Sequence, residues 1–313
     1  PRRLRALRPA LRAYQRVGGQ RLFRRLHLPP TLAAMEQLLP PLGPVEPVPE
    51  LTVAVGSRRA RVALLLGCVQ REFFSEVNAA TARVLAAEGC DVLAPRVQGC
   101  CGALSLHMGR EAQAVALAKR LIATFEALQV DAIVVNAAGC GSSMKDYGWL
   151  LRDVPAWQRR AEALSRRVRD VSELLVELGP VAARHPLPVT VAYHDACHLA
   201  HAQGIRAQPR ALLAGIPDLQ VREILEPDIC CGSAGVYNLL QPATAAELGD
   251  RKAANVARTG AEVLVTANPG CLMQVQAALE RAGQPMRMAH TVQVLDASLR
   301  GTAAEMIGRN TDK

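Results

Sequence analysis

Two pairs of adjacent cysteines, each followed by glycine, are the residues of this chain best suited to chemistry. Cys100 and Cys101 lie in the stretch QGCCGALSLHMG, and Cys230 and Cys231 lie in DICCGSAGVYNLL. Thiolates bind zinc and iron–sulfur clusters, and they also act as redox groups. The chain has nine cysteines and no visible export signal, which favours metal ligands over disulfides. The repeated CCG therefore predicts two thiolate sites.

Four more cysteines complete two sets with the same spacing. The first set is Cys68, Cys100, Cys101 and Cys140, and the second is Cys197, Cys230, Cys231 and Cys271. Equivalent members are separated by 129, 130, 130 and 131 residues. These separations are nearly constant, which indicates an internal duplication. The ninth cysteine, Cys90, belongs to neither set and is expected to be a small buried apolar residue.

The segments around these cysteines predict an α/β fold. Apolar runs at 61–66 and 132–136 precede cysteines of the first set, and 188–197 and 262–271 repeat this pattern. Such runs are typical of parallel strands covered on both faces, and residues 70–88 have helical spacing. Sites in parallel α/β sheets form beyond the carboxyl ends of the strands. We therefore expect two homologous α/β domains with parallel sheets, each bringing four cysteines to one sheet edge.

The chain is expected to divide into five segments. They are a basic helical arm with a Pro-rich linker (1–50), a first domain (51–154), a helical connector (155–186), a second domain (187–300) and a tail (301–313). The first 26 residues contain nine Arg and no acidic residue, while the whole chain has a net charge of +9. This arm could contact an anionic membrane surface, an acidic partner or a neighbouring domain. The nearly neutral remainder predicts no binding to nucleic acid.

Three chemistries compete for the adjacent cysteines. A disulfide between neighbours is disfavoured, because adjacent Cα atoms lie about 3.8 Å apart and disulfides need roughly 4.4–6.8 Å. Structural zinc usually uses Cys-x2–4-Cys pairs, and the chain contains no Cys-x2-Cys. Adjacent thiolates can reach different irons of one cluster, and the glycine permits a tight turn around it. The pattern favours an iron–sulfur cluster, with zinc and redox thiols as alternatives.

Histidines lie beside the first cysteine of the second set only, while His107, which follows the first CCG, is expected to pack around its own turn. His194 and His198 flank Cys197 in HDACHLAH, and no histidine lies next to Cys68. A histidine beside a cluster can donate a hydrogen bond to sulfur, supply a proton or bind iron. The alternative is that both histidines bond locally around the next helix. The difference predicts that the two sites are not equivalent.

These motifs resemble a known family. The stretches LLLGCVQREFFSEVNAATARVLAAEGCDVLAPRVQGCCGALSLHMG, VVNAAGCGSSMKDYG, YHDACHLAHAQGIRAQPR, CCGSAGVYNLLQP and ANPGC resemble the cysteine-rich CCG domains of heterodisulfide reductase and its relatives. Within that group they are most similar to iron–sulfur subunits of glycolate oxidase. The resemblance implies that the eight paired-set cysteines bind one or two clusters of the 4Fe–4S type. It also implies that the chain has no catalytic residue and transfers electrons from a flavin-containing partner subunit, which oxidises glycolate to glyoxylate, toward a membrane quinone. The location it implies is cytoplasmic, with peripheral contact to the inner membrane through the basic arm.

The chain departs from the family in two ways. Heterodisulfide reductase has a fifth cysteine in each set, and Ser143 and Gln274 occupy those positions here. Four-cysteine sets argue against disulfide-cleaving chemistry. The family's ferredoxin-like region, with its Cys-x2-Cys-x2-Cys-x3-Cys-Pro runs, is absent from this sequence, and truncation is the simplest explanation. Alternatives to glycolate are lactate or anaerobic glycerol-3-phosphate oxidation, and a heterodisulfide-reductase-like thiol enzyme.

Overall fold

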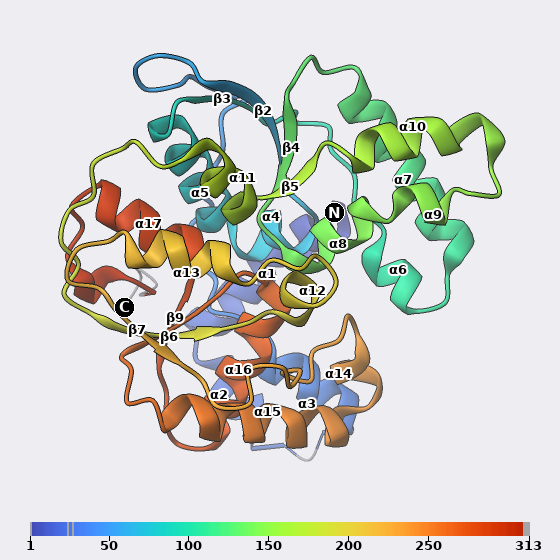
Figure 1. The fold of residues 1–313 in the computed structure, drawn as a ribbon. Coiled ribbons are helices and arrows are strands. Elements are labelled where there is room, and N and C mark those ends of the chain that lie inside the picture. The colour runs from blue at the N-terminus through green and yellow to red at the C-terminus, as the bar shows by residue number, and fades with distance from the viewer. Residues whose placement is uncertain (1, 24, 27, 309–313) are drawn as a thin grey trace.

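Two parallel sheets form the framework of the protein (Figure 1). The computed structural model describes residues 2–23, 25–26 and 28–308. The first sheet has the order β1-β3-β2-β4-β5, and only β1 is antiparallel to its neighbour. The second sheet has the order β7-β6-β8-β9, and all its strands are parallel. The strands are β1 (Leu51–Thr52), β2 (Ala60–Leu65), β3 (Cys90–Leu93), β4 (Ala132–Val135), β5 (Val168–Asp170), β6 (Thr190–His194), β7 (Gln220–Glu223), β8 (Val263–Thr266) and β9 (Arg287–His290). The order β3-β2-β4-β5 corresponds to β7-β6-β8-β9, which confirms two homologous α/β domains.

The central strands are those that the apolar runs predicted. Every residue of β4 and β8 is buried, because helices cover both faces of a parallel sheet. The edge strand β7 is mostly exposed, and its sequence QVRE lacks an apolar run. Apolar continuity therefore identified β2 and β4 of the first sheet and β6 and β8 of the second, but neither β3 nor the edge strands.

Helices lie between successive strands in the chain, as crossover connections between parallel strands require. The first domain contains α4 (Val69–Phe73), α5 (Ser75–Ala87), α6 (Ala103–His107), α7 (Glu111–Glu126), α8 (Ala138–Lys145), α9 (Tyr147–Leu150), α10 (Pro155–Ser165) and α11 (Val171–Leu178). The second contains α12 (Cys197–Ala200), α13 (Ala207–Ala214), α14 (Tyr237–Leu240), α15 (Pro242–Ala257), α16 (Pro269–Arg281) and α17 (Thr291–Leu299). The predicted helix at 70–88 is divided into α4 and α5, since Phe74 leaves the helical conformation with φ −136° and ψ 47°.

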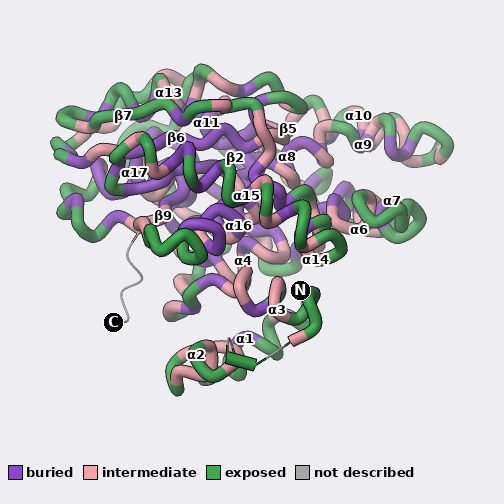
Figure 2. Tube along the Cα trace, turned by 90° about the horizontal axis from the view of Figure 1, so that it is seen from below, coloured by how far each residue is buried: buried purple, intermediate pink, exposed green. Residues whose placement is uncertain are grey.

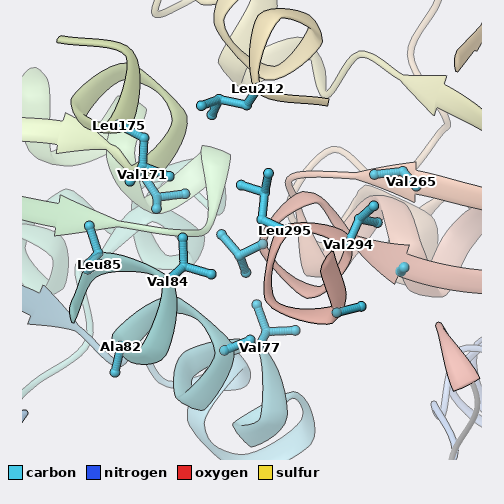
Figure 3. Packing of buried hydrophobic residues seen from close by; sticks show 14 of the residues in the cluster. Val77, Ala82, Val84, Leu85, Val171, Leu175, Leu212, Val265, Val294 and Leu295 are labelled. Atoms are coloured by element: carbon cyan, nitrogen blue, oxygen red, sulfur yellow. The ribbon is translucent and has the colours of Figure 1, made fainter. Parts of the chain in front are cut away.

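One hydrophobic core is shared by the two domains (Figure 3). Helix α5 of the first domain packs on α17 of the second, and α11 packs on α13. Val84 and Leu85 of α5 belong to the same buried cluster as Leu295 of α17. At the rim of this contact, Arg83 Nη2 lies 2.7 Å from a carboxylate oxygen of Asp296. The relative position of the two domains is thus determined by an apolar helical layer between the sheets.

The N-terminal segment is helical, as predicted, and consists of α1 (Arg2–Arg16), α2 (Gly19–Phe23) and α3 (Pro30–Gln37). Figure 2 shows α1 and α2 at one side of the molecule, with largely exposed surfaces. Arg8 is buried and donates to the carbonyl oxygens of Glu72 and Gly43, each at 2.6 Å. Helix α3 packs on α14 and α15 of the second domain. The arm therefore contacts both domains.

The connector expected to be helical at 155–186 contains a strand. Between α10 and α11, Val168–Asp170 forms β5 and pairs with β4. Asp170 then caps α11, and its side chain accepts from the backbone N–H of Ser172 at 2.8 Å. Three residues are too few to show a periodicity, so pairing with β4 decides their conformation. The tail contains a 3-10 turn at Ala304–Met306, and its residues 309–313 lie outside the described part of the chain.

Candidate metal centres

The first cysteine set converges at the carboxyl ends of β2 and β4. Cys68 directly precedes α4, and Cys140 lies in the first turn of α8. The Sγ atoms of Cys68 and Cys100 are 3.3 Å apart. The Cys101 thiol interacts with both Cys100 and Cys140. All four predicted ligands of the first site are therefore brought together.

The second set has the same arrangement in the second domain. Cys197 begins α12 and Cys271 lies in the first turn of α16. The thiol of Cys197 interacts with Cys230, and that of Cys231 interacts with Cys271. These helices begin at the ends of β6 and β8, the strands equivalent to β2 and β4. The duplication inferred from cysteine spacing is thus also a duplication of the site.

The glycine of each CCG motif adopts a conformation that other residues avoid. Gly102 has φ +87° and Gly232 has φ +92°, in the left-handed region that favours glycine. Their backbone N–H groups donate to the sulfurs of Cys100 at 3.5 Å and Cys230 at 3.4 Å. An added Cβ would lie 3.1 Å from the Ala114 carbonyl oxygen at Gly102, and 2.5 Å from that of Ala245 at Gly232. The glycine therefore lets the turn pack on the next helix while the backbone bonds to a thiolate.

The thiols within each set strongly perturb one another. Hydrogen bonds from Cys101 and Cys68 lower the pKa of Cys100 to about 3. The pKa values of Cys68 and Cys101 are raised, mainly by their bonds to the same Cys100 thiolate. One thiolate is thus stabilised only while its neighbours stay protonated. Four thiolates at such a site need compensating positive charge, which bound metal supplies.

Buried polar atoms without partners among the described residues also fit an anionic metal cluster. Just after Cys68 in the sequence, these include the donors Nε and Nη2 of Arg71 and Nε2 of Gln70. Burial lowers the pKa of Arg71, and Glu72 and, less strongly, Cys68 oppose that shift. At the second site, Nε2 of His194 is also buried without a partner among the described residues. Unsatisfied buried donors are costly, and a bound cluster with its sulfur atoms would give them acceptors. The residues present therefore fit an iron–sulfur cluster.

The two predicted histidines both lie at the second site. A ring nitrogen of His194 and the sulfurs of Cys231 and Cys271 all lie within 4.8 Å of one another. Nδ1 of His198 is 3.6 Å from Cys197 Sγ. A third polar neighbour is Asn268, whose Nδ2 donates to Cys271 Sγ at 3.4 Å. The second site thus has two histidines and an asparagine beside its sulfurs.

The two sites are neighbours across the domain boundary. The backbone N–H of Ala138 donates to the carbonyl oxygen of Ala267 at 3.1 Å, which links the ends of β4 and β8. Helices α8 and α12 pack together, as Figure 1 also shows. The His107 ring, in the first domain, lies edge-on to His198 with 5.3 Å between centroids. Sequence reasoning placed His107 within its own turn, and no local pattern could reveal this contact.

Of the other residues discussed from the sequence, Cys90 and Gln274 are buried, and Ser143 has a buried hydroxyl oxygen. Cys90 is fully buried in β3, as expected. Both amide atoms of Gln274 are hydrogen-bonded: its Nε2 donates to the Ala245 carbonyl oxygen at 2.8 Å, and its Oε1 accepts from Asn238 at 3.0 Å. Ser143 Oγ is buried and has no partner in the described part of the chain. Within the described ranges, no helix is both long and apolar enough to span a bilayer.

Comparison with known proteins agrees with this architecture. Residues 62–145 and 191–276 match the CCG family model, described as a cysteine-rich domain, and residues 1–39 match the linker region of the glycolate oxidase iron–sulfur subunit. The chain is 38% identical over 290 residues to the probable glycolate oxidase iron–sulfur subunit of Bacillus subtilis, covering 90% of this chain and 65% of the relative. It is 32% identical over 238 residues to lactate utilization protein A of an Exiguobacterium species, covering 75% of this chain and 96% of the relative.

One solved structure has a similar fold. A hypothetical protein from Helicobacter pylori superposes with a TM-score of 0.55 at 11% identity, covering 88% of this chain and 55% of that one. The present chain spans about 65% of the length of the Bacillus subtilis relative. The two cysteine-rich domains and the linker match together show that this chain belongs to the CCG cysteine-rich family, among the glycolate oxidase iron–sulfur subunits and their relatives.

Proposed function

We propose that the chain is the electron-transfer subunit of a flavin-dependent 2-hydroxy-acid oxidase, with glycolate as the acid. Cys68, Cys100, Cys101 and Cys140 hold one 4Fe–4S cluster, and the second set holds another. The observation that carries this proposal is the convergence of two four-thiol sets at adjacent sheet edges. Bound iron–sulfur clusters accept and donate single electrons.

The chain's own residues have three roles in this proposal. The cysteines bind the clusters, and the CCG glycines donate backbone N–H groups to a sulfur of each site. Helices α8 and α12 keep the sites next to each other. The oxidation of the acid belongs to a flavin-containing partner, and this chain moves electrons from that flavin toward a quinone.

The basic arm supports contact with a partner or a membrane. Arg3, Arg16, Arg21 and Arg25 are exposed, and Leu22 and Leu26 on the same segment are 66% and 54% exposed. Exposed basic and apolar side chains on one segment suit an anionic lipid surface. In this proposal the protein is cytoplasmic and lies peripherally at the inner membrane.

Lactate is the second candidate substrate of the complex. The Exiguobacterium relative is named for lactate utilization and is covered over 96% of its length. Glycolate is favoured because the relative with 38% identity is named for glycolate oxidase, and because the arm matches that subunit's linker model.

Iron and acid-labile sulfide per chain, measured after anaerobic purification, test the cluster assignment. Substantial iron with matching sulfide is expected, with an EPR signal after dithionite reduction. A Cys100→Ser/Cys101→Ser variant should lose the signal of one site. The matched control is Cys90→Ala, which changes a fully buried cysteine outside both sets and should keep all the iron. Protein that stays iron-free after reconstitution would exclude the proposed function.

Purification of the complex from its host tests the partner and the substrate. A flavoprotein that co-purifies and oxidises glycolate faster than lactate is the expected result. Faster oxidation of lactate would transfer the assignment to the second candidate. A chain that retains iron but binds no flavoprotein would exclude the oxidase complex.

A further inference from the structure

His194 has an unusual position for a buried histidine. It is the last residue of β6 and is 2% exposed. Its Nε2 atom is buried and has no hydrogen-bond partner among the described residues. A ring nitrogen lies within 4.8 Å of the sulfurs of both Cys231 and Cys271. The pKa of Cys271 is lowered by its bond to Cys231 and, less strongly, by a hydrogen bond with the His194 imidazole. The imidazole is therefore directed at the second site from the end of a central strand.

The equivalent residue of the first domain has no such capacity. Cys68 corresponds to Cys197, so His194 corresponds to Leu65, the last residue of β2. Leu65 is 1% exposed and packs in the outer core of the first domain. The same backbone position thus holds an apolar side chain at one site and a metal-binding side chain at the other.

A purely structural role leaves Nε2 of the histidine without a partner among the described residues. A buried polar atom without a partner is destabilising, and an apolar residue at this position, as in the first domain, would avoid that cost. The nearby polar side chains are already occupied: Asn268 Nδ2 donates to Cys271 Sγ, and Lys252 Nζ donates to the Glu226 carbonyl oxygen at 2.6 Å. A metal bound between the two sulfurs would satisfy the imidazole.

We propose that His194, together with Cys231 and Cys271, binds iron at the second site in place of one of the other two thiolates of the set. This site is then a mixed thiolate–imidazole centre, while the first has thiolates only. The inference rests on the proposed function, because it assumes an iron–sulfur cluster. Imidazole is neutral where a thiolate carries charge, and replacement of thiolate by histidine raises the potential of such clusters. The second site is then the stronger electron acceptor of the pair.

Pulsed EPR of the reduced, cluster-loaded full chain tests the assignment. Protein is prepared with natural histidine and with 15N-histidine, and the nitrogen couplings of the cluster are compared. An iron-bound imidazole should give a strong coupling that changes with the isotope. This measurement needs no substitution, so a variant that fails to fold cannot obscure it.

Two variants identify the histidine responsible. His194→Leu copies the first site's Leu65 and should abolish the isotope-dependent coupling and shift one midpoint potential downward. His198→Asn is the control, because His198 lies beside Cys197 at 3.6 Å but is not the assigned ligand, and the coupling should remain.

The outcomes separate the two levels of the proposal. Iron-loaded wild-type protein without a histidine-dependent coupling overturns the ligand assignment and leaves the proposed function standing. A coupling that survives in His194→Leu and disappears in His198→Asn also overturns it. Protein that cannot be loaded with iron overturns the proposed function, and the assignment with it.

Discussion

Replacement of Gly232 by alanine tests whether the CCG turn is required by backbone geometry. Gly232 has φ +92°, and an added Cβ would lie 2.5 Å from the carbonyl oxygen of Ala245 in α15. That atom belongs to the backbone of a long helix, so it cannot move aside as a flexible side chain can. The substitution must therefore displace the turn that carries Cys230 and Cys231.

The expected cost follows from three contributions. The left-handed conformation costs a residue with a Cβ about 1–2 kcal/mol. Steric overpacking costs about 1–3 kcal/mol more. Alanine restricts the unfolded chain, which returns about 0.4–1 kcal/mol. The free energy of unfolding should fall by about 1–4.5 kcal/mol for Gly232→Ala.

Two other glycines provide matched controls. Gly102→Ala at the first site has the same backbone strain, at φ +87°, but its Cβ would lie 3.1 Å from the nearest atom. With the same gain from the restricted unfolded chain, a loss of about 0–1.5 kcal/mol is expected. Gly139 lies within α8 next to Cys140, and a Cβ there would meet nothing within 4 Å. Gly139→Ala should be neutral or stabilise by about 0.5–1 kcal/mol, because alanine favours the helix.

Anaerobic urea denaturation, followed by circular dichroism and by iron release, measures this order. Gly139→Ala should be at least as stable as the wild type. Gly102→Ala should be less stable than the wild type, and Gly232→Ala should be the least stable of the three variants. Iron should be lost at lower urea only from the site whose glycine is changed. A Gly232→Ala protein as stable as Gly102→Ala would show that the turn can move freely, and it would refute the steric argument.

Three further predictions concern a salt bridge between the domains, a buried histidine and the attachment of the N-terminal arm. Arg83→Ala removes the guanidinium that bonds to the buried carboxylate of Asp296 at 2.7 Å, so the stability measured by urea denaturation should fall by about 2 kcal/mol; an unchanged midpoint would contradict this. Burial lowers the pKa of His290 to about 4, below the usual 6.5 or so of an unfolded chain. The unfolded state therefore binds more protons between these values, and up to about 3 kcal/mol of stability should be lost as the pH falls from 6.5 or so to 4; His290→Asn, which can still cap α17, should flatten that dependence in urea titrations at several pH values. Arg8→Ala removes two hydrogen bonds to the carbonyls of Glu72 and Gly43, so trypsin should cleave the arm at least about tenfold faster, and equal cleavage rates would show that these bonds do not hold α1.

Much of the framework could be read from local patterns. The apolar runs located β2, β4, β6 and β8, because a strand buried on both faces must be apolar at every position. The edge strands escaped detection, and the prediction of helix at β5 was wrong, because short strands at an edge show neither alternation nor a continuous run. Pairing with β4 through backbone hydrogen bonds determined β5 instead.

The contacts between the domains had no counterpart in the local pattern. Arg83 and Asp296 are separated by 213 residues in sequence, and His107 reaches His198 in the other domain. Such contacts depend on how one sheet with its helices lies on the other. Side-chain type alone could not distinguish His107 at its own turn from His107 at the neighbouring site.

The sequence by itself determined that this protein has two α/β domains and two four-cysteine sets. Buried strands appear in it as apolar runs, and the cysteines of the two sets repeat with nearly constant separation. Only the tertiary structure decided that the two sites are neighbours, and that His194 is directed at Cys231 and Cys271 without another partner among the described residues. Those features depend on the packing of α5 on α17 and of α8 on α12, which arises when separate apolar surfaces are buried together, and no single segment of the chain specifies it.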